Sequence, residues 1–444
     1  MLDQKNKSMF QIFLSYSIPC IIAMFLTSFI TIVDGIFIGS KMGGNGLAAI
    51  NLTLPVLYLL LALTIMIGVG GITLASHSLG EKNHNSANQK FTFALTINFL
   101  LNLACFIILF FFQEQIILLL NAKGKLYGYV RDYLGVMKYF YLFMMLNLTF
   151  SMFIRSEGKP QLSLLFGVIG NIINIILDYL FIMKFNWGMK GAAIASGLSV
   201  LFPFIIGMIY FLSRWSVYKL AKFNFQISVL KKMLLLGSAE FIAQISISII
   251  TYIFNWVLLK RIGINGVAAF TIIGYISFIE NMILTGIAVG IHPVISYNFG
   301  AKNREAILKL LYIALKAVVL VGVMTFIISF LAGNMIIRVF AKQNLELFHI
   351  ANLGLKLFSI SYILNGYNIL AAAYFTSLGD SSTAALISIL RSLVLVCVLI
   401  IILPYFIGNV GIWLTAPFTE LITFAVSLNR IKRSTKGLLL ANGS

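Results

Sequence analysis

The sequence predicts an all-α membrane protein with twelve membrane-spanning helices in two six-helix halves. The chain of 444 residues is 60% hydrophobic and only 10% charged, whereas a soluble domain carries roughly 25% charged residues. Apolar stretches of about 20 residues, each long enough to cross a hydrocarbon core of about 30 Å, recur along nearly the whole chain. The second half also repeats the first. In lipid the backbone must satisfy its own hydrogen bonds, so these stretches are expected to be helices.

The apolar stretches place the twelve spans in order. Helices are expected at residues 10–36, 47–75, 91–112, 130–153, 162–183, 191–213, 233–258, 267–295, 310–337, 347–375, 384–404 and 411–428. An even number of spans puts both ends of the chain on the same side of the membrane.

The net charge is +19, but the distribution of the basic residues indicates the membrane topology rather than nucleic-acid binding. They gather in short segments between the apolar stretches, with an excess on the side that holds Lys5, Lys7, Lys82 and Lys302. Cytoplasmic loops carry such an excess. We therefore expect a multi-pass membrane protein with both termini and the central linker in the cytoplasm.

The repeat is visible in matching segments. GGNGLAAI from Gly43 and GINGVAAF from Gly263 align at a shift of 220 residues, and the same shift pairs Asn83 with Asn303. Each repeat holds six spans, so the halves share one topology and are related by a pseudo-two-fold axis along the membrane normal. The expected parts are an N-lobe at 1–213, a linker at 214–232, a C-lobe at 233–430 and a tail at 431–444.

Five acidic residues fall at membrane depth: Asp34, Asp178, Glu240, Glu280 and Glu420. A charge at the bilayer centre costs about 2.5–3.5 kcal/mol, so each is expected to face the bundle interior and is a functional candidate. The equivalent positions of the first four in the other repeat hold no acid. The scaffold is duplicated, but its acid chemistry is not.

In the first half, polar residues line single helix faces. Asn171, Asn174 and Asp178 are spaced i, i+3, i+7 in one helix, and Asp34 follows Thr31 by one turn in another. Both aspartates are expected at similar depth, so they can meet. Two carboxylates with an amide and a hydroxyl fit an Na⁺ site or a proton-carrying pair. The alternative is that these polar groups satisfy one another in a packed bundle.

In the second half, Glu240 and Gln244 begin a polar stripe along the seventh helix that continues through Ser248, Thr251 and Asn255. This stripe is expected to line a water-filled cavity; the alternative is hydrogen bonding between helices.

Three further charged positions lie in later helices of the second half. Glu280 lies beside Asn281 near the middle of the eighth helix, at an expected depth about 12 Å from Glu240, so no pairing of the two is expected. Glu420 is open to a cavity role or a structural one. Arg391 is expected to snorkel to the cytoplasmic surface.

The sequence resembles the multidrug and toxic compound extrusion (MATE) family, in particular its DinF-like and MepA-like bacterial members, over residues 8–430. The resemblance rests on Pro19 and Asp34, the loop SHSLGEKNHNSANQ with its echo PVISYNFGAKNREAI, the segment IRSEGKPQ, and NIINIILDY followed by WGMKGAAIASGLS. It implies a V-shaped pair of lobes that works by alternating-access antiport in the bacterial inner membrane. Pro19 corresponds to a proline that is associated in the family with bending of the first helix.

The resemblance also implies a cation site in the first lobe at Asp34, Asn174, Asp178 and Ser196, the serine standing where relatives more often have threonine. Pro19, Thr31 and Asn171 are expected to support it, and Glu240, Gln244, Glu280 and Asn281 to line a substrate cavity in the C-lobe.

The expected function is a multidrug exporter coupled to Na⁺ or H⁺ that moves organic cations or xenobiotics and contributes to antibiotic resistance. The partners are small organic molecules and the lipid bilayer, without nucleic acid, and the chain is expected to be a monomer. No phosphate-cradling loop and no convergent nucleophile and base are visible, so neither a cofactor besides the coupling ion nor an enzyme is expected. A flippase of lipid-linked saccharides and an exporter of a dedicated natural product remain alternatives.

Overall fold

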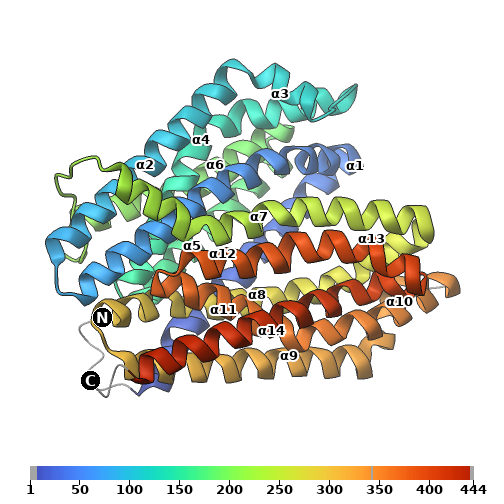
Figure 1. Cartoon of the computed structure of the whole chain (residues 1–444). Helices are drawn as coiled ribbons and strands as arrows, with labels where there is room; N and C mark the ends of the chain where they lie inside the picture. The colour runs from blue at the N-terminus through green and yellow to red at the C-terminus, as the bar shows by residue number, and fades with distance from the viewer. Residues whose placement is uncertain (1–7, 342–343, 441–444) are drawn as a thin grey trace. The chain divides into compact units, whose positions relative to one another are not determined.

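The computed structural model describes residues 8–341 and 344–440, which fold into helices without a strand in those ranges (Figure 1). The first half comprises α1 (Met9–Gly80), α2 (His84–Phe111), α3 (Gln113–Leu119), α4 (Lys125–Ser156), α5 (Pro160–Asp178), the π-helix η1 (Tyr179–Lys184) and α6 (Gly188–Leu212). The second half comprises α7 (Ile227–Arg261), α8 (Ile264–Gly300), α9 (Arg304–Ala341), α10 (Leu345–Phe358), the 3₁₀-helix η2 (Ser359–Ser361), α11 (Tyr362–Leu378), α12 (Ser381–Ile389), the π-helix η3 (Leu390–Val394), α13 (Leu395–Ile407) and α14 (Val410–Leu440).

The prediction of twelve spans is confirmed. Eleven described helices are long and apolar enough to cross a membrane, and the 72-residue α1 is one of them. A helix of that length reaches about 108 Å, far more than one crossing needs, and α1 breaks at Gly43 with φ of 62° and ψ of −158°. It therefore supplies two spans, and the other ten helices bring the total to twelve.

Several helices extend beyond their predicted ends. α2 begins at His84 rather than at residue 91, because the Asn83 side chain accepts a hydrogen bond from Ser86 N (3.0 Å) and caps the extra turns. α7 begins at Ile227, inside the predicted linker, and α14 runs through the predicted tail to Leu440. Hydropathy marks only the part of a helix that lies in hydrocarbon, so these polar ends were missed. The expectations for Lys5, Lys7 and residues 441–444 lie outside the described residues.

The described chain forms two compact units. Unit 1 is Ile22–Gly237, and unit 2 combines residues 8–21 with residues 238–440. The boundaries fall inside α1 and α7, so the first turns of each helix belong to a different unit from the rest of it. In unit 2 a Cβ on Gly290 would lie 2.9 Å from Tyr16 O, which shows how closely the start of α1 packs on α8.

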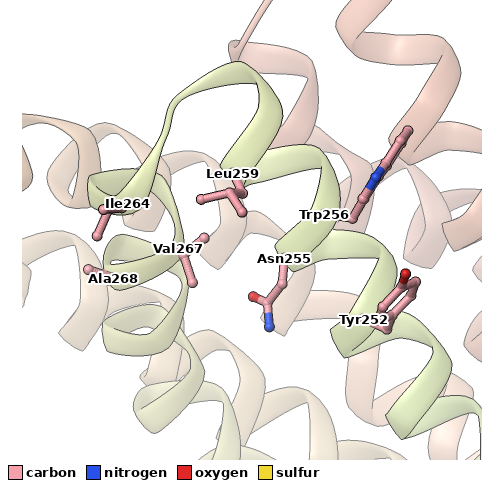
Figure 2. Close-up of a pocket in the computed structure, with 7 residues that line it drawn as sticks. All are labelled: Tyr252, Asn255, Trp256, Leu259, Ile264, Val267 and Ala268. Atoms are coloured by element: carbon pink, nitrogen blue, oxygen red, sulfur yellow. The ribbon is translucent and has the colours of Figure 1, made fainter.

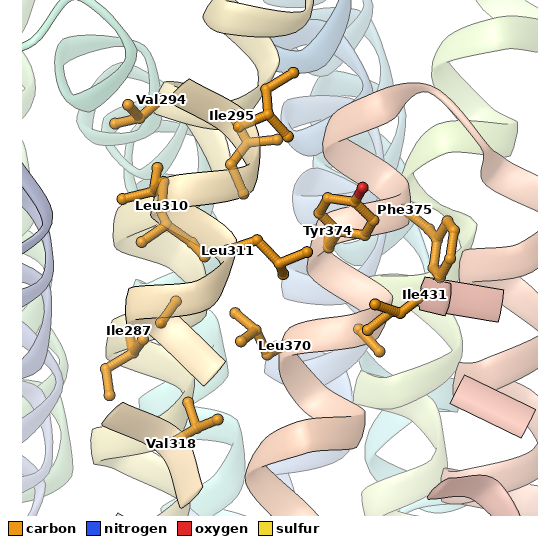
Figure 3. Packing of buried hydrophobic residues seen from close by; sticks show 14 of the residues in the cluster. Ile287, Val294, Ile295, Leu310, Leu311, Val318, Leu370, Tyr374, Phe375 and Ile431 are labelled. Carbon is orange, nitrogen blue, oxygen red and sulfur yellow. The ribbon is translucent and has the colours of Figure 1, made fainter. Parts of the chain in front are cut away.

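Each unit has its own apolar core. In unit 1, Leu134 and Met145 of α4 pack with Met189 and Ala193 of α6. In unit 2, Figure 3 shows a larger cluster in which side chains of α8, α9, α11 and α14 interdigitate. The labelled members of that cluster are Ile287, Val294, Ile295, Leu310, Leu311, Val318, Leu370, Tyr374, Phe375 and Ile431.

The repeat seen in the sequence is also present in the backbone. Lys82 and Lys302 both have left-handed φ angles, 61° and 55°, each at the residue before the Asn that caps the next helix. Gly43 and Gly263 are likewise both left-handed, at 62° and 92°. Non-glycine residues seldom adopt this conformation, so its recurrence at matched positions marks two copies of one structural unit.

Candidate cation site and buried charge network

Asp34 of α1 and Asp178 of α5 come together in unit 1, as their similar expected depth allowed. The two carboxyl groups lie close enough to interact electrostatically. Asp178 is only 1% exposed, and both of its carboxyl oxygens, together with Asp34 Oδ1, have no hydrogen-bond donor among the described residues. Two carboxyl groups in contact favour the loss of one charge or the arrival of a cation, because like charges at such separation repel strongly.

Asn174 lies one turn before Asp178 on the same face of α5. It is 4% exposed, and its Oδ1 atom also has no donor within the described part of the chain. The site therefore offers four buried oxygen acceptors from three residues that protein donors leave open. Buried polar atoms are nearly always paired in native structures, so this concentration of open acceptors fits a cation.

Ser196 of α6 reaches the site through Tyr133 of α4, with whose hydroxyl its side chain shares a hydrogen bond. Tyr133 also lies close enough to Asp34 and Asp178 to interact electrostatically with both. Sequence reasoning missed Tyr133, because a tyrosine near a helix end is ordinary at a membrane interface. The four helices α1, α4, α5 and α6 thus each contribute a side chain.

Local backbone features hold these side chains in place. α5 ends at Asp178 and the chain continues as the π-helix η1, a form that is frequent at functional sites. α5 and α6 approach closely at Gly170, where a Cβ would lie 2.8 Å from Ser199 O. The glycine lets the helix carrying Asn174 and Asp178 pack tightly on the helix carrying Ser196.

The three residues expected to support the cation site, Thr31, Asn171 and Pro19, lie in different surroundings. The Thr31 hydroxyl donates to Thr27 O (3.0 Å), so it is used within α1, and Asn171 is partly buried on α5. Pro19 is buried but lies in the segment of α1 that packs with unit 2, whereas Asp34 belongs to unit 1.

No group of three or more His, Cys, Asp or Glu side chains that could hold a metal occurs in residues 8–341 and 344–440. The site in unit 1 has two carboxyls and one amide, with a serine and a tyrosine beside them. Such a set of oxygens carries little charge, which suits a monovalent cation better than a divalent one.

Unit 2 contains a buried charge network of Glu280, Asn365, Arg391, Glu420 and Asn368. Asn365 Nδ2 donates to Glu280 Oε2 (2.9 Å), and Arg391 donates from Nη2 to Asn365 Oδ1. Arg391 Nε also pairs with Glu420 Oε1 at 3.1 Å. Asn368 Nδ2 donates to Glu420 Oε2 at 2.7 Å. One arginine thus links the two glutamates.

The expectation that Arg391 snorkels to the cytoplasmic surface is wrong. Its side chain is only 20% exposed and is held by Glu420 inside unit 2. The partners on α11 and α14 lie far away in the sequence, and hydropathy gives no sign of them. Glu280 is 1% exposed, and its second oxygen, Oε1, has no donor among the described residues.

Glu240 is linked to the same network by charge. It interacts electrostatically with Arg391, as Glu280 does. Glu240 and Glu280 were not paired by their expected depths, but both interact with the guanidinium of Arg391. Asn281 is directed back into α8, where its Nδ2 donates to Ser277 O (2.8 Å), and Gln244 is partly buried one turn after Glu240.

The polar stripe of α7 ends at a pocket. Figure 2 shows Asn255 of α7 beside Tyr252, Trp256, Leu259 and, from α8, Ile264, Val267 and Ala268, around a hollow of about 530 Å³. The pocket is mainly apolar, and Glu240 lies about 22 Å away along α7 at the rise of a helix.

A duplicated bundle of membrane-spanning helices, with open acceptors and buried charges at membrane depth, defines a membrane transport protein. The family model MatE matches residues 19–180 and again residues 240–402, one match in each repeat. The chain therefore belongs to the MatE family of transporters and is not an enzyme.

The chain is similar over nearly its full length to curated members of this family. Multidrug export protein MepA of Staphylococcus saprophyticus is 26% identical over 410 residues, which cover 92% of this chain and 90% of that protein. The protein of the same name from Staphylococcus aureus (strain MRSA252) is 27% identical over 413 residues, with the same coverage.

Solved structures share the fold. A MATE protein in complex with MaL6 superposes with a TM-score of 0.90 at 22% identity over 97% of both chains. A transporter of the MOP superfamily from Pyrococcus furiosus gives 0.89 at 21% identity, also over 97% of both chains.

Proposed function

We propose that the chain is a secondary active exporter of organic cations and xenobiotics, driven by exchange for Na⁺ or H⁺. The observation that carries this proposal is the group of four buried oxygens on Asp34, Asn174 and Asp178 that no protein donor satisfies. The two similar MepA proteins are named multidrug export proteins, which supports the breadth of the substrates.

The coupling ion binds at Asp34, Asn174 and Asp178, with Ser196 and Tyr133 as the neighbouring hydroxyls. A proton on one carboxyl, or Na⁺ between them, removes the repulsion between two buried negative groups. The packing of α1 against α5 then depends on whether the ion is present. This dependence gives the gradient a means to shift the protein between conformations, since a ligand shifts an equilibrium by its differential affinity for the two states.

The substrate's charge is recognised in unit 2, by Glu240 and Glu280 with Gln244 and Asn281 beside them. These acids outnumber the single guanidinium of Arg391, so the network carries an excess of negative charge when its carboxyls are ionised. A lipophilic cation would be attracted there, and the aromatic pocket at Trp256 offers the apolar surface that such compounds bind.

A flippase of lipid-linked saccharides is the second candidate among transporters, since its cargo carries anionic phosphate. The buried charges of the described residues favour cations instead, because Arg391 is already paired with Glu420 and acids surround it. The excess of basic loop residues supports cytoplasmic termini in an inner membrane. Each chain contains both units, so we propose that it works as a monomer.

Proteoliposomes loaded with a fluorescent lipophilic cation test the proposal. An Na⁺ gradient and a pH gradient are imposed in separate experiments, and export against the cation's own gradient is expected with one of them and not with the other. Export with neither gradient would contradict the coupled mechanism. A lipid-linked saccharide donor in the same vesicles is expected to stay in its leaflet. Movement of the donor, without any ion-driven export of the cation, would reverse the choice between the candidates.

A further inference from the structure

The chain between α6 and α7, residues 213–226, is a non-helical strap that is fastened to unit 1. The carboxylate of the buried Glu157 accepts hydrogen bonds from Ser216 Oγ (2.5 Å) and Tyr218 N (2.8 Å). Further along, Lys219 N donates to Asn88 Oδ1 (2.9 Å) and Ala221 N donates to Thr92 Oγ1 (3.0 Å). One side-chain hydroxyl and three backbone N–H groups within six residues are thus bonded to α2 and Glu157, so the strap has one defined path.

Aromatic contacts fix the same path. The ring of Tyr218, which is fully buried, stacks on Phe91 with centroids 5.3 Å apart. Phe223 and Phe225 both lie against Phe93, at 5.3 and 5.6 Å. The strap therefore belongs to unit 1 along its whole length and directs one defined surface away from it.

That outer surface combines large apolar side chains with cations. Trp215 is 74% exposed, Phe225 62% and Leu220 53%. Arg214 and Lys222 are exposed beside them, and Lys231 and Lys232 follow at the start of α7. Exposed tryptophan next to lysine and arginine is typical of the boundary between hydrocarbon and headgroups.

The cations of this surface are not matched by acidic residues in the same segment of the chain. The sequence has no acidic residue between Asp178 and Glu240, and Glu157 is already used by the strap's own donors. None of the ion pairs among residues 8–341 and 344–440 includes Arg214, Lys222, Lys231 or Lys232.

The position of the strap in the chain indicates which kind of molecule binds its outer surface. It begins directly after Leu212, where the apolar helix α6 ends, and leads to Ile227, the first residue of α7, whose apolar part follows Lys232. Because it is fastened at the ends of two spans, it is held at the level where hydrocarbon gives way to headgroups. An acidic protein partner would match the cations but would leave Trp215, Leu220 and Phe225 without an apolar medium.

We propose that the strap is a binding surface for the anionic phospholipids of the adjacent leaflet, with phosphate groups at Arg214 and Lys222 and acyl chains against Trp215 and Leu220. This proposal does not depend on the identity of the coupling ion or the transported substrate.

Quenching of Trp215 by brominated lipid tests the surface in the full chain. The protein is reconstituted in phosphatidylcholine bilayers that contain a minor fraction of brominated phosphatidylglycerol or the same fraction of brominated phosphatidylcholine. The chain has four tryptophans, so the difference between the wild type and Trp215→Phe isolates the signal. Brominated phosphatidylglycerol is expected to quench Trp215 more strongly, at a local enrichment of about fivefold or more.

The double variant Arg214→Gln/Lys222→Gln is expected to lose this enrichment while quenching by brominated phosphatidylcholine persists. Lys123→Gln/Lys125→Gln, which removes the same charge from the exposed start of α4, is the matched control and should keep it. Leu220→Trp in the Trp215→Phe background places the reporting tryptophan at a second position on the strap. Stronger quenching by brominated phosphatidylglycerol is expected there too, which shows that the result does not depend on residue 215 alone. The proposal is overturned if neither lipid quenches Trp215, which would indicate that the surface contacts water or a protein partner. It is also overturned if both lipids quench Trp215 equally.

Discussion

Arg391 of the π-helix η3 pairs with Glu420 of α14 through Nε and Oε1 at 3.1 Å, inside unit 2. The pair is screened from water, since the two side chains are 20% and 10% exposed. Removing one partner of a buried pair leaves an uncompensated charge and destabilises by about 3–5 kcal/mol, whereas removing both often has little effect.

Arg391→Gln should therefore lower the melting temperature of the purified protein sharply. The double variant Arg391→Gln/Glu420→Gln is expected to recover most of the loss, because the amides can still bond with Asn365 and Asn368. Thermal melts of the wild type, both single variants and the double variant give the coupling directly. Additive losses would mean that the ion pair does not stabilise unit 2.

Tyr133 provides a test of the hydroxyl that sequence reasoning missed. Tyr133→Phe removes the hydrogen bond with Ser196 and the hydroxyl near the two aspartates. A hydrogen bond between neutral groups contributes about 0.5–1.5 kcal/mol, so the ion concentration for half-maximal export should rise about two- to tenfold. Tyr139→Phe, at an exposed position on the same helix, should leave it unchanged, and an equal response of both variants would remove Tyr133 from the site.

Gly237 tests the close packing of α7 on α1 within unit 1. A Cβ there would lie 1.8 Å from Met66 O, a backbone atom that cannot move aside. Gly237→Ala is expected to destabilise by about 1–3 kcal/mol or more through overpacking. Gly167→Ala, where a Cβ would meet nothing within 4 Å, should instead stabilise α5 by about 0.5–1 kcal/mol. Melting temperatures that shift in the same direction would contradict the described packing.

Asp380 caps α12 by accepting a hydrogen bond from Thr383 N (3.1 Å). Burial opposes its charged form, but hydrogen bonds from Thr383 and Ser382 and the charge of Arg430 hold the pKa of Asp380 below its ordinary value. Because the folded pKa is depressed, the stabilisation is complete above the unfolded pKa of about 3.9 and is lost as the pH falls through the folded value.

Asp380→Ala should consequently lower stability by about 1 kcal/mol at neutral pH. The difference from the wild type should shrink when melting is measured below about pH 3.9. Asp380→Asn retains an acceptor and should lose less. A difference that does not change with pH would assign the effect to the shape of the side chain rather than to its charge.

The fold was largely predictable because its signals are local or periodic. Apolar runs set the spans, and the matched positions Gly43 and Gly263 revealed the repeat. Helix ends were less predictable, since caps such as Asn83 extend helices beyond the apolar region. Among the described residues, α3 is the one helix that was not predicted, because its seven residues are too few to produce a hydropathy signal.

The sites were predictable only where one helix face carries them. The spacing of Asn174 and Asp178 indicated a common face, and equal depth suggested Asp34 as a neighbour. The network in unit 2 could not be deduced in this way. Arg391 meets Asn365 and Glu420 through tertiary packing of three helices, and neither hydropathy nor spacing within one helix records which side chains face each other across a bundle.

The most direct test of the account is ion-driven export by the Asp34→Asn and Asp178→Asn variants in proteoliposomes. Neutral amides keep the shape of the site but cannot exchange a proton or balance the charge of Na⁺, so each variant should fall to the level of empty vesicles while its melting temperature stays near that of the wild type. Asp132→Asn, which changes an exposed carboxylate in the same unit, should export normally. Full gradient-dependent export by the double variant Asp34→Asn/Asp178→Asn would contradict the account.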